Sequence, residues 1–166
     1  MRTSLSKVSQ GCRCGLFVIA LALATMSSAR ADEDPQMGVW RLDTMKSRFT
    51  GEGPRSVIEH FSRAGDEVSY RRDMVDEQGR QVVITYSARF DGKEYPMLGN
   101  ANADSVIIRR IDQHTMGLTY KKAGRVMSEH IRVISADGRT ATLTAQRRDS
   151  HGEMLNHTVV LEKVEP

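Results

Sequence analysis

Five histidines could serve this protein as metal ligands or as proton carriers. They are His60, His114, His130, His151 and His157. No two of them lie two or four residues apart, and no His-Glu-x-x-His pattern occurs, so the spacing places no pair around one zinc ion. Two of them directly follow a glutamate, Glu59 or Glu129, but neighbouring residues of a strand point to opposite faces. The sequence therefore predicts no metal site and no cofactor.

Covalent catalysis lacks a recognisable nucleophile in this sequence. No serine stands in a Gly-x-Ser-x-Gly turn, and no glycine-rich loop has the pattern that holds a phosphate. The two cysteines, Cys12 and Cys14, lie in a segment that we expect to be removed, so no thiolate remains. Carboxylates are numerous, but no spacing selects an acid–base pair. The sequence therefore predicts that the protein is not an enzyme.

The first 31 residues have the three parts of a secretory signal peptide. Residues 1–15 are polar and basic, residues 16–26 form an apolar run, and Ala29 and Ala31 complete an Ala-x-Ala cleavage site. This run is too short for a transmembrane helix, which needs about 20 apolar residues. Both cysteines precede the run, whereas a lipidated cysteine would follow it. We expect a periplasmic or secreted protein with no membrane anchor after cleavage.

Removal of the signal peptide changes the net charge of the protein. The whole chain has 24 Lys and Arg residues against 21 Asp and Glu residues, which gives a net charge of +3. Residues 1–31 hold four of the basic residues and none of the acidic ones, so residues 32–166 have a net charge of −1. The arginine doublets at 71–72, 109–110 and 147–148 fall in expected strands, where one member points out and the other in. We therefore expect no nucleic-acid partner.

From residue 39 onward the apolar residues recur with a period of two, which is typical of strands. Nine such segments lie within residues 39–42, 57–62, 68–74, 82–90, 106–111, 116–120, 127–133, 140–145 and 155–161. Turn residues such as Asp-Gly separate them at short intervals. An antiparallel meander hides its edges best by closing on itself. The sequence thus predicts an all-β fold, an antiparallel up-and-down meander closed into an 8–10-stranded barrel.

The length allows one ordinary domain. We expect residues 32–37, which begin with three acidic residues, to form a mobile lead-in and residues 38–166 to form a single barrel domain. The longest early interruption, residues 44–55, is rich in Gly and Pro and is expected to be a loop.

Short motifs follow one another in a distinctive order. They are Gly-Val-Trp at 38–40, Lys-Ser-Arg-Phe at 46–49, Phe-Asp-Gly-Lys-Glu-Tyr-Pro at 90–96, Gly-Asn at 99–100, Asp104, Arg-Ile-Asp at 110–112, Lys-Lys-x-Gly-Arg-Val at 121–126 and Ser-x-Asp-Gly-Arg-Thr at 135–140. This order resembles that of the calycin group, the lipocalins and fatty-acid-binding proteins. It is similar above all to small secreted bacterial lipocalin-like proteins, mostly without an assigned function.

The resemblance implies a barrel of eight to ten strands with Trp40 plugging one end and an interior pocket for a small apolar molecule. Two features depart from the fatty-acid-binding proteins. Residues 44–55 are too short and too rich in Gly and Pro for a helix-turn-helix lid, and the last expected strand has no Arg-x-Tyr for a ligand carboxylate. The resemblance therefore does not carry fatty-acid binding over to this chain.

Six residues share the alternation of the apolar, inward-facing positions and are candidate ligand contacts. They are Tyr70, Arg72, Tyr86, Tyr120, Glu129 and His157. Tyrosine combines an apolar ring with a polar tip, which suits a pocket wall and ordinary barrel packing alike. A charge on the inner face must be paired or wet. Its presence indicates either a buried salt-bridge network or the polar end of a ligand cavity.

Two functional hypotheses follow from these observations, and a third, an uncharacterised enzyme, would need a concave cluster of titratable groups. The first is non-catalytic binding of a small apolar or amphipathic molecule inside a monomeric barrel. The second is a packed-core envelope interaction protein, or a stress-associated structural protein, that has no ligand. The signature of the second would be an exposed apolar patch on the outer face of a strand. The outer faces that the pattern assigns are rich in Arg, Asp, Glu and Thr.

Overall fold

The computed structural model describes residues 34–148 and 154–164 of the chain. The expected signal peptide, residues 1–31, lies outside the described residues. Within them, no helix is long and apolar enough to cross a membrane.

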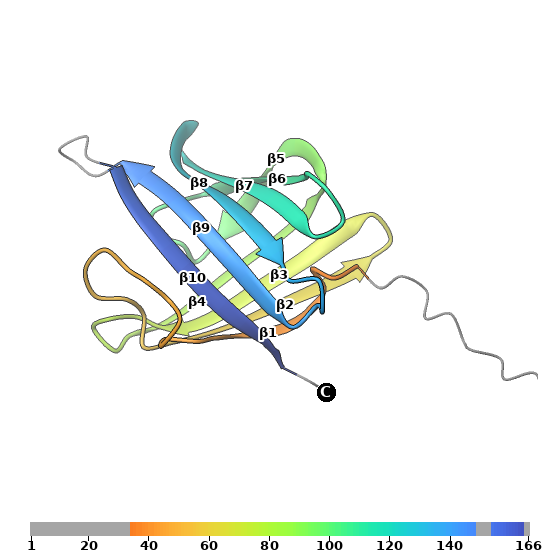
Figure 1. The fold of residues 1–166 in the computed structure, drawn as a ribbon. Helices are drawn as coiled ribbons and strands as arrows, with labels where there is room; N and C mark the ends of the chain where they lie inside the picture. The colour runs from red at the N-terminus through yellow and green to blue at the C-terminus, as the bar shows by residue number, and fades with distance from the viewer. Residues whose placement is uncertain (1–33, 149–153, 165–166) are drawn as a thin grey trace, which may run out of the picture. The chain divides into compact units, whose positions relative to one another are not determined.

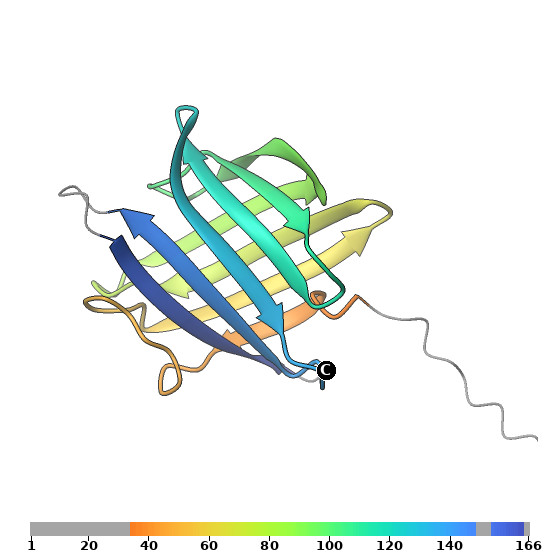
Figure 2. The same ribbon diagram turned by 45° about the horizontal axis from the view of Figure 1, so that its top comes forward.

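Ten antiparallel strands, each hydrogen-bonded to its neighbours in chain order, form a barrel that closes where β1 pairs with β10 (Figures 1 and 2). The strands are β1 (Gly38–Leu42), β2 (Ser56–Ala64), β3 (Glu67–Val75), β4 (Gln81–Arg89), β5 (Asp91–Leu98), β6 (Ser105–Arg110), β7 (Thr115–Lys122), β8 (Arg125–Ile134), β9 (Thr140–Arg148) and β10 (Met154–Val164). The predicted fold class is confirmed. The chain has the lipocalin-like, up-and-down barrel that the period-two pattern indicated.

The alternation of side chains explains why the sheet closes around a core. In β4, Ile84, Tyr86 and Ala88 are buried, whereas Val83 and Ser87, on the opposite face, are exposed. One strand was missed in the sequence. The sequence of β5 is typical of a turn because it begins with Asp-Gly and contains Pro96, which has no N–H to donate to a neighbouring strand.

The loop between β1 and β2 behaves as its composition predicts. It contains no strand or helix beyond a single bridge between Arg48 and Thr158. The Ser47 hydroxyl donates to the Asp43 carbonyl and accepts from the Val160 N–H, so the loop lies against β10.

Residues 34–37 span the end of the barrel at which β1 begins. Asp34 forms ion pairs with Arg63 at the end of β2 and with Arg110 at the end of β6. Gln36 has no exposed surface, and its side-chain amide donates to the His114 carbonyl in the turn after β6. The expected mobile lead-in is therefore, in the part that the structure describes, bound to both sides of the barrel end.

The face assignment of β8 is wrong in the sequence analysis. The apolar pattern placed Glu129, Ile131 and Val133 on the inner face, but all three are exposed, and Arg132 and Ile134 are buried instead. The outer face of this strand carries apolar side chains and its inner face carries polar ones. A prediction of the inner face from hydrophobicity alone is therefore reversed for this strand. A one-residue error in register would exchange the two faces in the same way.

Gly99 lies directly after β5, where the chain enters the 99–104 loop and passes close to β4. Its φ is +80°, and an added Cβ would lie 1.8 Å from the Val83 carbonyl oxygen. We expect Gly99→Ala to lower the free energy of unfolding by more than about 3 kcal/mol, since left-handed strain alone costs about 1–2 kcal/mol. Gly65→Ala is the control, because Gly65 also has a positive φ but nothing within 4 Å of the added Cβ. Equal losses in urea unfolding would contradict this account.

Candidate ligand-binding site in the barrel

A partly open cavity of about 510 Å³ lies in the barrel. Its lining comes from β3, β4, β5, β7, β8, β9 and β10 and from the 99–104 loop. The lining residues are Tyr70, Arg72, Ile84, Met97, Asn100, Asn102, Ala103, Tyr120, Met127, Ser128, His130, Ala145 and His157. A volume of this size is in the range of small-molecule pockets, which are mostly apolar with a few convergent polar groups.

A buried carboxylate contacts two residues of the cavity wall, Tyr70 and Arg72. Glu59 on β2 is 2 % exposed, and all of its hydrogen bonds come from inward-facing side chains of other strands. Its Oε1 accepts from Arg72 Nη2 at 2.6 Å, from Arg72 Nε at 3.1 Å and from Tyr70 Oη at 2.9 Å. Its Oε2 accepts from Arg132 Nη1 at 2.7 Å. The network thus joins β2, β3 and β8 across the interior.

The ionisation of Glu59 depends on its two arginine partners. Burial raises the pKa of the carboxyl group, but the charges of Arg72 and Arg132 outweigh burial and lower this pKa to about 2. The Tyr70 hydroxyl has its pKa raised well above the usual value, mainly by burial, so it remains a neutral donor. At neutral pH the interior therefore contains one carboxylate and two guanidinium groups in direct contact.

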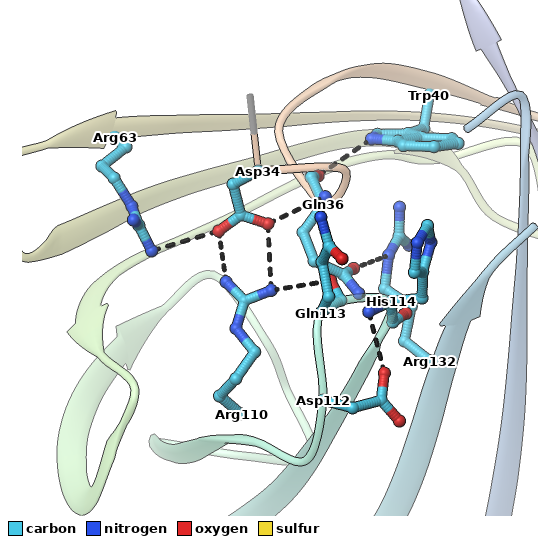
Figure 3. A network of polar contacts seen from close by, with 9 residues as sticks. All are labelled: Asp34, Gln36, Trp40, Arg63, Arg110, Asp112, Gln113, His114 and Arg132. Carbon is cyan, nitrogen blue, oxygen red and sulfur yellow. Dashed lines mark hydrogen bonds and ion pairs between the residues drawn. The ribbon is translucent and has the colours of Figure 1, made fainter. Parts of the chain in front are cut away.

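Arg132 also contacts the segment at the end of the barrel, and Figure 3 shows it beside Gln36 and Trp40. Its Nε donates to the Gln36 side-chain oxygen at 3.1 Å, and Gln36 in turn accepts through its carbonyl from the Trp40 ring N–H at 3.2 Å. The guanidinium lies 4.9 Å from the Trp40 ring centre and 4.8 Å from the Phe61 ring centre. A guanidinium over an aromatic face is stabilised by the ring quadrupole. Trp40 is fully buried and lies outside the cavity lining, so it packs the end of the barrel.

The charges of this interior network do not cancel. Glu59 is the acid that pairs with Arg72 and Arg132 in the described residues, and it serves both. The cluster therefore has a net charge of +1 in a low-dielectric interior, where an uncompensated charge is costly. Arg72 retains 23 % of its side-chain surface and faces the cavity, so the excess charge is accessible from there.

His130 presents a neutral ring to the cavity. Burial lowers its pKa, with a further contribution from the charge of Arg72, and the result is a pKa of about 4. Its Nε2 lies 2.9 Å from the Ser128 hydroxyl, and its Nδ1 is buried without a hydrogen-bond partner among the described residues. The ring therefore adds a hydrogen-bonding position beside Arg72 without adding a second charge.

The structure brings four of the six sequence-predicted residues to the cavity wall, namely Tyr70, Arg72, Tyr120 and His157. Tyr86 is buried and stacks on Tyr70 at 4.5 Å between ring centres, outside the cavity lining. Glu129 lies on the outer surface of β8, so its placement on the inner face is wrong. A ligand-binding role for the six stays a prediction.

Sequence reasoning missed three ionisable residues of the cavity and its network, Glu59, His130 and Arg132. Glu59 shares its alternation with Val57 and Phe61, so the signal for an inward acid was present in β2. His130 and Arg132 gave no such signal, because the apolar residues of β8 lie on the other face.

Comparisons with known proteins concern the fold of this chain. No protein family and no curated protein matches the sequence. Among solved structures, zebrafish ileal bile acid-binding protein in complex with cholic acid has a TM-score of 0.52 and 12 % identity, over 78 % of this chain and 99 % of that one. Lobster apocrustacyanin A1 has a TM-score of 0.42 and 14 % identity, over 81 % of this chain and 63 % of that one. The first of these likenesses shows that the barrel has a lipocalin-like fold.

The described residues contain no group of three or more His, Cys, Asp or Glu side chains that could hold a metal ion.

Glu59→Gln tests the buried network. We expect the variant to lose about 3 kcal/mol of unfolding free energy at pH 7, because it leaves two buried guanidinium groups without a carboxylate. The pKa of Glu59 is lowered from 4.5 to about 2, so its contribution is complete above about pH 4.5 and disappears as the pH falls to about 2. The difference between wild type and variant should narrow over this window in urea unfolding followed by Trp40 fluorescence.

The matched control is Asp73→Asn, which removes an exposed ion pair with Arg71 on the outer face. We expect it to cost less than about 1 kcal/mol. The role of the network would be contradicted if Glu59→Gln had the same free energy of unfolding as the wild type at pH 7. It would also be contradicted if the difference in unfolding free energy between the two proteins stayed constant down to pH 2.

Proposed function

We propose that this protein is a non-catalytic binder of a small amphipathic molecule, whose apolar part occupies the barrel cavity and whose acidic or strongly accepting group lies at Arg72. The observation that carries this proposal is the cavity of about 510 Å³ with an accessible, incompletely neutralised guanidinium in its wall. The solved structure of the bile acid-binding protein with cholic acid supports the use of such a barrel for an amphipathic ligand.

The other residues of the cavity wall suit a ligand with an apolar part and a polar group. Ile84, Met97 and Ala145 offer apolar surface, and Met adapts its shape to irregular ligands. Asn100 and Asn102 lie in the 99–104 loop and offer polar contacts at the cavity wall. A ligand anion at Arg72 would balance the charge that Glu59 leaves over, so binding would replace an electrostatic cost by a charge-assisted hydrogen bond.

The alternative function, interaction with another macromolecule through an exposed apolar patch, also has a supporting observation. Ile111, Ile131 and Val133 are each more than 40 % exposed. This patch lies on the outside of the barrel and does not compete with the cavity for residues. The two functions are therefore compatible.

We also propose that the protein acts outside the cytoplasm, in the periplasm or the medium. The support is the sequence of residues 1–31, with its basic start, its apolar run and its Ala-x-Ala site.

A pair of ligands that differ only in the head group tests the proposed function. We expect decanoate to bind at least tenfold more tightly than decan-1-ol in isothermal titration calorimetry, because a hydrogen bond to a charged group contributes about 1.5–3 kcal/mol. Arg72→Gln should weaken decanoate about tenfold and leave decan-1-ol unchanged.

Two variants serve as controls for this comparison. Arg71→Gln changes the adjacent arginine, which faces outward and pairs with Asp73, and should leave both affinities unchanged. Ala145→Trp fills the cavity and should abolish both. The proposal fails if neither ligand binds the wild-type protein, or if Ala145→Trp binds them as tightly as wild type.

A further inference from the structure

The outer face of β6, β7, β8 and β9 has a hollow of about 450 Å³, whose lining combines isoleucines with polar and charged side chains. In Figure 2 the strands from β7 to β9, coloured green-blue to blue, lie toward the viewer. Gly117 on β7 lines the hollow together with Ile107, Ile111 and Ile131. We name this surface the Gly117 face.

Neither the backbone conformation at Gly117 nor the space around it requires a glycine. Its φ is not positive, and an added Cβ would meet the Cδ1 atoms of Ile111 and Ile131 at 3.6 and 3.8 Å, which are ordinary contacts. A glycine in the middle of a strand costs about 0.5–1 kcal/mol relative to alanine. Such a glycine often marks a place where a ligand or another backbone approaches closely. The hollow therefore has the character of a receptor for a side chain from outside.

The Gly117 face also contains an exposed isoleucine, whose Cδ1 lies 3.8 Å from the position of a Cβ added at Gly117. Ile131 is the direct cross-strand neighbour of Gly117 and is 44 % exposed. A knob and a hole that lie side by side on one surface complement each other when a second copy of the same surface is placed against it by a two-fold axis.

Two charges of opposite sign flank the apolar centre. Arg109 pairs in register with Gly117 from β6, and Glu129 pairs with Thr119 from β8. Both line the hollow, both are exposed, and neither forms an ion pair within residues 34–148 and 154–164. They lie on opposite sides of β7, so a two-fold axis can place Arg109 of each copy against Glu129 of the partner subunit.

We propose that the Gly117 face is a self-association surface that binds a second copy of this chain. Ile131 of each copy enters the hollow over Gly117 of the partner subunit, and the two Arg109–Glu129 contacts fix the relative orientation. This differs from the monomer expected from the sequence, and it does not depend on a ligand in the barrel.

The size of the surface sets the expected strength of this contact. Four strands about 4.8 Å apart, each contributing about seven residues at 3.3 Å, cover about 450 Å² per copy. The total of about 900 Å² is at the low end for specific interfaces. We therefore expect a reversible dimer with a dissociation constant in the micromolar range.

Analytical ultracentrifugation of the protein from 2 to 500 µM tests this proposal. The weight-average mass of the wild type should rise from that of a monomer toward that of a dimer. Gly117→Thr fills the hollow with a good strand former and should raise the dissociation constant at least tenfold without lowering the free energy of unfolding. Ile131→Thr should weaken the dimer similarly.

The matched control is Ile58→Thr, since Ile58 is 39 % exposed on the outer face of β2, away from the Gly117 face. Its dissociation constant should equal that of the wild type. Arg109→Glu and Glu129→Arg should each weaken the dimer, and the double variant should restore it. A wild-type protein that stays monomeric at 500 µM overturns the proposal. So does a Gly117→Thr variant that dimerises like the wild type, or a double charge variant as weak as the single ones.

Discussion

The structure depends on one carboxylate, Glu59, which is buried in the barrel and holds two arginines at once. Arg72 lies on the neighbouring strand, but Arg132 comes from β8, four strands away around the closed sheet. An isolated carboxylate would lose its charge in such a place, and an isolated guanidinium would be expelled from it. Each of the three is tolerated only because the other two are present. The contact therefore ties opposite walls of the barrel together in one geometry.

The consequences of this contact extend to both ends of the barrel. Toward the closed end, Arg132 carries the network to Gln36 and lies against the ring of Trp40, so the N-terminal segment is positioned by the same cluster. Toward the cavity, Arg72 lies in the wall and remains partly accessible, while its partner Glu59 is shared with Arg132. One carboxylate against two guanidinium groups leaves a positive charge in the interior. This charge is the reason why we propose an acidic, amphipathic ligand.

The sequence predicted the fold well and the site only in part, for a single physical reason. Alternation identifies strands and closes the sheet, and it correctly turned Tyr70 and Arg72 inward, because the apolar residues of β3 mark the inner face. In β8 the same rule failed, because Ile131 and Val133 lie outside while His130 and Arg132 lie inside. No local pattern reveals that a strand carries its apolar residues on the outer face, since the partners that make Arg132 acceptable are up to 96 positions away. Arg72 pairs with Glu59 because the two are direct cross-strand neighbours on the inner face of β2 and β3.

The position of a bound carboxylate relative to Arg72 tests the central claim most directly. A crystal structure of the protein grown with decanoate should show the alkyl chain in the barrel cavity and the carboxylate within hydrogen-bond distance of the Arg72 guanidinium, with Glu59 still bound to Arg132. An alkyl chain bound in the opposite direction, with its carboxylate in solvent and Arg72 unchanged, would contradict the claim that the shared carboxylate leaves a charge for the ligand.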